Sequence, residues 1–67
     1  MIIVPRNVKE RTSAKLLKAS IAYCEQEGAS EIYNVAELGE KDFRIMYYMG
    51  EEPHRKMKAV LLKIPFE

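Results

Sequence analysis

One cysteine, Cys24, and one histidine, His54, strongly constrain how this chain of 67 residues can be stabilised. A chain this short buries only about 60% of the surface that its unfolded form exposes, so its own core gives marginal stability. Small domains usually add disulfides, a metal ion or a second subunit. One cysteine excludes an internal disulfide, and one cysteine with one histidine cannot complete a tetrahedral zinc site within a single chain. We therefore expect a homodimer or a higher homo-oligomer.

The composition is that of a folded globular protein, with 48% apolar and 31% charged residues. A net charge of +1 gives no bulk attraction for nucleic acid. The longest apolar runs are far too short for a membrane span, and an unpaired cysteine without an export signal favours the cytosol. We expect a single cytoplasmic domain over residues 1–67, without membrane contact, cofactor or metal.

The N-terminal third predicts a short strand followed by a helix. Residues 2–4 are all apolar and β-branched, and Pro5 ends the run, which is typical of a strand. Asn7 and Glu10 have the spacing of a helix capping box. Thr12 or Ser13 would serve as a later helix start.

The predicted helix ends at Glu27, because Gly28 suits a left-handed C-terminal cap. Its apolar residues recur at helical spacing and predict an amphipathic helix with one buried face. The centre of that face is formed by Ala14, Leu17, Ile21 and Cys24, and it is widened by Leu16, Ser20 and Tyr23.

Three segments rich in apolar, aromatic and β-branched residues follow the helix, over 31–38, 43–49 and 57–64. The first two are separated by a connection of hairpin length, and Pro53 keeps the second connection out of the sheet. These patterns predict an α+β fold of order β-α-β-β-β: a short N-terminal strand, one amphipathic helix, and an antiparallel meander with the helix on one sheet face.

Both faces of the predicted sheet carry apolar side chains. On the strand over 43–49, one face holds Phe43, Ile45 and Tyr47, and the other holds Arg44, Met46 and Tyr48. A single helix covers only one face, so the second needs another cover. We predict an interface at Arg44, Met46, Tyr48 and Leu61. Aromatic and arginine side chains on a sheet also suit base stacking, which is the alternative use of this face.

Charge is segregated along the chain although the total is small. Residues 1–18 carry five cations and one anion, residues 19–42 carry one cation and six anions, and residues 43–67 carry five cations and three anions. Three cations gather where the helix is predicted to begin: Arg6, Lys9 and Arg11. Together with unpaired helix N–H groups, they form a candidate anion-binding site.

The predicted topology also allows this charge to be neutralised inside the fold. It places the basic helix start at the same end of the sheet as Glu37, Glu40 and Asp42. It places the basic loop of His54, Arg55 and Lys56 beside Glu25, Glu27 and Glu31. Both interpretations, an anion site and internal neutralisation, are open at this point.

The sequence holds no catalytic constellation that we can identify. Cys24 falls in the apolar stripe near the helix C-terminus, where the helix dipole disfavours a thiolate. We predict a non-catalytic protein-interaction module that acts as a homo-oligomer and that can bind another protein. The alternative is a protein that binds nucleic acid or a phosphate ligand through the basic helix start and the Tyr/Met/Arg sheet face.

Overall fold

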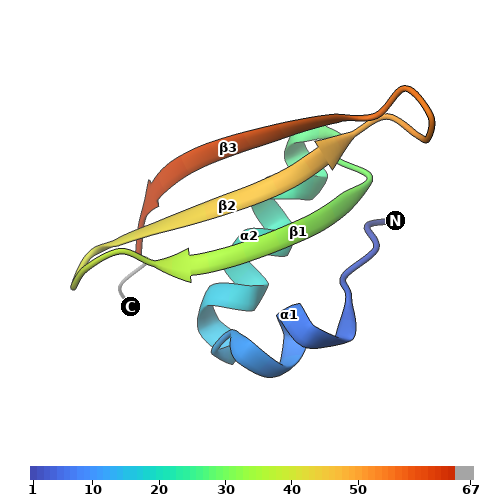
Figure 1. Cartoon of the computed structure of the whole chain (residues 1–67). Helices are drawn as coiled ribbons and strands as arrows, with labels where there is room; N and C mark the ends of the chain where they lie inside the picture. Colours follow the sequence, from blue (N-terminus) through green and yellow to red (C-terminus); the bar gives the residue numbers. More distant parts are fainter. Residues whose placement is uncertain (65–67) are drawn as a thin grey trace.

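The computed structural model describes residues 1–64, which form two helices followed by a three-stranded antiparallel sheet (Figure 1). The helices are α1 (Arg6–Arg11) and α2 (Ala14–Glu27), and the strands are β1 (Glu31–Glu37), β2 (Asp42–Met49) and β3 (Lys56–Lys63). The strands are ordered β1-β2-β3 across the sheet. The α+β class and the antiparallel meander predicted from the sequence are confirmed.

The prediction of an N-terminal strand over residues 2–4 is wrong. This segment makes a single parallel bridge to β1, in which Ile3 N–H donates to the Ser30 carbonyl and Ile32 N–H donates to the Ile3 carbonyl, both at 3.0 Å. Pro5 follows at once; it has no N–H to continue the pairing, and it forms the N-cap of α1. The first regular element is therefore a helix, and the order is α-α-β-β-β.

The single predicted helix is divided in two at residues 12 and 13. Thr12 has an extended backbone, and Ser13 begins α2 by accepting a hydrogen bond from Leu16 N–H at 3.3 Å. Ser13 is thus the helix start that the sequence offered as an alternative. The prediction that Asn7 and Glu10 form a capping box is wrong. Both residues lie inside α1, and the N-cap of α1, Pro5, makes no side-chain hydrogen bond.

The C-terminal cap of α2 is as predicted. Gly28 has a φ of 78°, in the left-handed region that favours glycine. Its N–H donates to the Glu25 carbonyl at 3.2 Å, and Ala29 N–H donates to the Cys24 carbonyl at 2.9 Å. These two bonds satisfy carbonyl groups that the last helical turn would otherwise leave unpaired.

The buried face of α2 is rotated from the predicted one. Leu16, Ser20 and Cys24 are its buried residues, whereas Leu17 and Ile21 are half-buried at its flank. The apolar residues of α2 extend around more than half of the helix, and the sequence pattern alone placed the centre of the buried stripe one position too far along the chain.

The core lies between the helices and one face of the sheet. In Figure 1 α2 runs behind the sheet, and α1 lies beside β1. The buried apolar residues are Val8, Leu16, Cys24, Ala29, Ile32, Phe43, Ile45 and Tyr47. Phe43, Ile45 and Tyr47 alternate along β2, as their spacing predicted. Neither α1 nor α2, the helices of residues 1–64, is long and apolar enough to cross a membrane.

Candidate interaction surface

The face of the sheet opposite the core is built by alternation along the strands and by cross-strand register. Residues directly opposite each other in an antiparallel pair share a face. Arg44 lies opposite Ala36 and Leu61, Met46 opposite Asn34 and Ala59, and Tyr48 opposite Glu31 and Met57. We call these nine residues, together with Tyr33, the outer face. Tyr33 lies at a register shift in β1, and its ring meets the edge of the Tyr48 ring at 5.9 Å between centroids.

The structure brings the four predicted interface residues together on the outer face. Leu61 is 66% exposed, while Arg44, Met46 and Tyr48 are half-buried by their neighbours. The same face carries Tyr33, which is 51% exposed, and Met57, which is 39% exposed. Large apolar side chains therefore meet water along this face, on the side of the sheet that α2 does not cover.

One end of the outer face is organised by Arg55. Its guanidinium carbon lies 3.7 Å from the centroid of the Tyr48 ring. Arg55 Nη1 donates to Glu31 Oε1 at 3.2 Å, and Nη2 lies 3.1 Å from Glu52 Oε1. The ion pair of Arg55 with Glu31 agrees with the interpretation that charges of this loop are neutralised inside the fold. Sequence reasoning missed the contact with Tyr48, because Arg55 lies in the β2–β3 loop and only its fold position reveals its neighbour.

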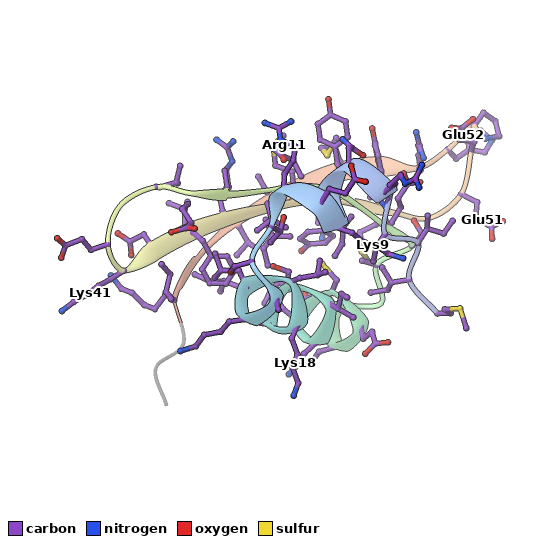
Figure 2. The ribbon with its side chains drawn as sticks, turned by 90° about the horizontal axis from the view of Figure 1, so that it is seen from below. Lys9, Arg11, Lys18, Lys41, Glu51 and Glu52 are labelled. Carbon is purple, nitrogen blue, oxygen red and sulfur yellow. The ribbon has the colours of Figure 1, made fainter. Side chains whose placement is uncertain are left out.

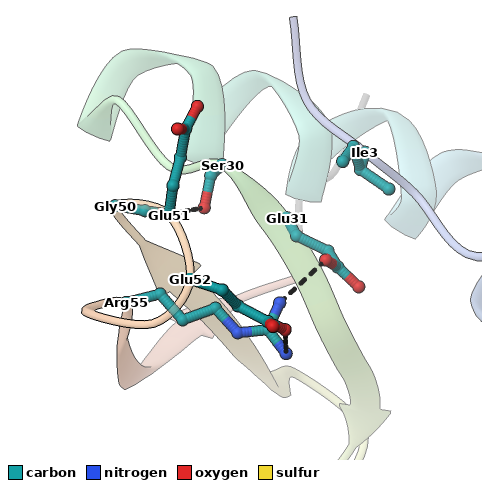
Figure 3. A pocket seen from close by; sticks show the side chains of 7 residues that line it. All are labelled: Ile3, Ser30, Glu31, Gly50, Glu51, Glu52 and Arg55. Carbon is teal, nitrogen blue, oxygen red and sulfur yellow. Dashed lines mark hydrogen bonds and ion pairs between the residues drawn. The ribbon is translucent and has the colours of Figure 1, made fainter.

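A hollow of about 310 Å³ lies beside this end (Figure 3). It is lined by Ile3, Ser30, Glu31, Gly50, Glu51, Glu52 and Arg55. Ser30 Oγ donates to the Gly50 carbonyl at 2.7 Å, and the Arg55 guanidinium is shared by two carboxylates. These paired groups hold the β2–β3 loop against the start of β1, so the polar lining of the hollow is engaged in contacts that stabilise the fold.

The opposite end of the outer face has a different character. Lys63 Nζ donates to Asp42 Oδ1 at 2.8 Å. Beside this pair, Leu38 and Leu61 are both exposed and line a second hollow, of about 370 Å³. Arg44 follows Asp42 on the same face of β2. Its Nε atom is buried and has no hydrogen-bond partner among residues 1–64. Because a guanidinium is always charged, a buried N–H without an acceptor is energetically costly.

The candidate anion site on α1 is not assembled by the structure. Arg6 pairs with Glu10 of the same helix at 3.5 Å, with both side chains exposed. In Figure 2 Arg11 points to the side of the sheet away from α2, and Lys9 points in a different direction. Asp42, expected near these cations, is paired with Lys63 instead. The contacts of residues 1–64 therefore do not gather Arg6, Lys9 and Arg11 around one point.

Cys24 and His54 do not form a reactive pair in the described part of the chain. Cys24 is fully buried, and burial, followed by the nearby Glu27 carboxylate, raises the pKa of its thiol to about 11. The thiol is therefore protonated and enclosed at neutral pH, while His54 lies in an exposed loop. Within residues 1–64, no group of three His, Cys, Asp or Glu side chains is arranged to hold a metal ion.

A second apolar surface lies along α2. Leu17 and Ile21, which the sequence assigned to the core, line a shallow hollow of about 450 Å³ with Ala14, Lys18, Ala22 and Glu25. Its existence follows from the rotation of the helix: residues predicted to be central to the buried face lie at its flank.

The chain matches no protein-family model, no curated protein and no solved structure at a significant level.

Proposed function

We propose that this protein is a small non-catalytic interaction module that acts as a homo-oligomer, with the outer face as its contact surface. The observation that carries the proposal is the exposure of Leu61, Tyr33 and Met57 on one face of a sheet whose other face packs on the core. Contiguous apolar patches of this kind mark interaction sites in folded proteins. A lone reduced cysteine is ordinary in the cytoplasm, which is where we place the protein.

The size of the outer face fits a small interface. A strand of eight residues spans about 26 Å and three strands span about 14 Å, so the face covers about 370 Å² in projection. Stable protein interfaces bury about 800 Å² of accessible surface on each partner. The projected area ignores the height of the side chains and the loops at both ends of the sheet, and both have to contribute for the contact to reach a typical interface area. The oligomer is therefore best sought over a wide concentration range, from about 5 to 500 µM.

The test is the solution mass of the chain and of one outer-face variant. Sedimentation velocity should show a species of twice 7.8 kDa that grows with concentration. Leu61→Glu should return the mass to that of a monomer, because an unpaired carboxylate is costly in an apolar contact. The matched control is Lys58→Glu, an exposed residue of the same strand whose register partner, Tyr47, belongs to the core face. A monomer at every concentration would contradict the proposal.

Binding of nucleic acid is the second candidate, and the direction of Arg11 toward the outer-face side is the observation that favours it (Figure 2). Tyr33 offers an exposed aromatic ring for base stacking. Against it, Arg55 already covers one face of the Tyr48 ring, and Lys63, the cation that β3 places on this side, is paired with Asp42. Affinity for single-stranded RNA that falls steeply with salt would support this candidate, and no retention at low salt would exclude it.

A further inference from the structure

We infer that two copies stack outer face to outer face. They are related by a two-fold axis that lies in the plane between the two sheets and runs perpendicular to the strands. In this arrangement Arg44 of each copy lies against Tyr48 and Glu31 of the partner subunit. The inference rests on the proposed function and adds the orientation of the dimer and the charged contact that sets it.

The first argument is the charge at the two ends of the outer face. The end at Tyr48 has two carboxylates, Glu31 and Glu52, and one guanidinium, Arg55. The end at Arg44 has an excess of positive charge, because two cations, Arg44 and Lys63, lie there with one carboxylate, Asp42. The middle row of Asn34, Met46 and Ala59 is uncharged. The face is therefore negative at one end and positive at the other.

The second argument is symmetry. A two-fold axis parallel to the strands would place each end over the same end of the partner, so that Arg44 would face the partner's Arg44. A two-fold axis perpendicular to the strands reverses the partner along the strand direction and places unlike ends together. The patch is then self-complementary in the way that closed dimers require. Aligned packing of twisted sheets at about −30° accommodates this arrangement.

The third argument is the unpaired guanidinium of Arg44. Arg44 is half-buried, and its side chain makes no hydrogen bond or ion pair among residues 1–64. Its Nε atom is covered within one copy, so the Nη groups make the contact: in the stacked dimer Arg44 lies over the partner's Tyr48, with the partner's Glu31 diagonally opposite. Glu31 uses Oε1 for Arg55, and a carboxylate has about four acceptor positions, so it can take a second guanidinium. Ala36, next to Arg44 in register, is small and leaves room opposite the partner's Glu31.

The apolar contacts agree with the same axis. Leu61 shares its row with Arg44, and Met57 shares its row with Tyr48. Reversal along the strands places Leu61 over the partner's Met57, and Met46 over the partner's Met46. The most exposed apolar side chain of the outer face therefore meets another apolar side chain.

A charge-swap mixing experiment tests the inference. Arg44→Glu alone should weaken self-association at least ten-fold, because both contacts become carboxylate against carboxylate. Glu31→Arg alone should weaken it similarly, because both contacts become guanidinium against guanidinium. An equimolar mixture should associate at least ten-fold more tightly than either variant alone, since each contact then joins opposite charges. Its affinity should stay below that of the wild type, because Glu31→Arg also removes the ion pair with Arg55 of the same copy. Lys58→Glu should leave the dissociation constant of the wild type unchanged. Circular dichroism of each variant checks that it is folded.

A second measurement reports the axis without relying on the charge variants. Ala59→Cys places a thiol in the middle row of β3, while the native Cys24 is fully buried. With the perpendicular axis, β3 faces the partner's β3, and a short bismaleimide should link two copies. With the parallel axis, β3 faces the partner's β1, and Ala59→Cys should not cross-link.

The outcomes separate the two claims. A wild-type dimer whose charge variants fail to combine, or whose Ala59→Cys variant fails to cross-link, overturns the inferred orientation and leaves the proposed function standing. A wild-type chain that is monomeric at all concentrations overturns both.

Discussion

Ser20 is a polar residue at the centre of the buried face of α2, and its replacement tests how that face is packed. The side chain is fully buried, and its hydroxyl has no hydrogen-bond partner among residues 1–64. Burying a hydroxyl without a partner costs about 1–3 kcal/mol in mutational data. Ser20→Ala removes this cost and gains about 0.5 kcal/mol of helix propensity. The void left by one oxygen offsets less than about 1 kcal/mol.

We therefore expect Ser20→Ala to raise the free energy of unfolding by about 1 kcal/mol, which is about 4–8 °C in Tm for a domain of this size. The matched control is Ser13→Ala in the same helix. The Ser13 hydroxyl accepts the Leu16 N–H at 3.3 Å as the N-cap, so its removal should cost about 1 kcal/mol. Urea titrations followed by circular dichroism, at one protein concentration, measure both. Equal destabilisation by the two variants would refute the packing described for Ser20.

Two further predictions concern the core. Leu16→Ala should lower the free energy of unfolding by about 3 kcal/mol, since Leu16 is buried. Leu17→Ala should lower it by only about 1 kcal/mol, since Leu17 is half-buried. Equal losses in urea titrations would contradict the helix orientation. Stability should also fall in alkali. Burial raises the pKa of Cys24 from 9.0 to about 11 and that of Tyr47 from 10.0 to about 12, with Tyr23 adding to the latter. The unfolded chain loses these protons first, so stability is full below about pH 8 and falls as pH rises from about 9, by about 1.4 kcal/mol per pH unit for each group. Cys24→Ala should delay the onset of this fall by about one pH unit, and an unchanged profile would show that Cys24 does not contribute.

The sheet was predictable from the sequence because its signal is local. The alternation of Phe43, Ile45 and Tyr47 with Arg44 and Met46 sets the two faces of β2, and the register of its neighbours follows from short connections. Tyr33 was missed because the register shift between Ile32 and Asn34 interrupts the alternation in β1, and nothing in the residue pattern marks that position.

The N-terminal part was less predictable because several signals compete there. Pro5 fits the end of a strand as well as the start of a helix, and the structure uses it as the N-cap of α1. Thr12 and Ser13 fit the inside of an irregular helix or its restart, and in the structure Ser13 restarts the helix as the N-cap of α2. The orientation of α2 depends on the sheet it faces, which a helical wheel alone does not contain.

The candidate site was predictable in its residues and not in its surroundings. Arg44, Met46, Tyr48 and Leu61 share a face because strand alternation and antiparallel register require it. The contacts of Arg55 with Tyr48 and Glu31 depend on the path of the β2–β3 loop, which no local pattern encodes.

A dilution series followed by amide NMR tests most directly whether the outer face holds two copies together. Between about 500 and 5 µM, the amide signals of Met46, Tyr48 and Leu61 should move together along one binding curve. The signals of Leu17 and Ile21, on the other apolar surface, should stay in place. Signals that do not change with concentration, or changes confined to Leu17 and Ile21, would contradict the assignment of the outer face as the contact surface.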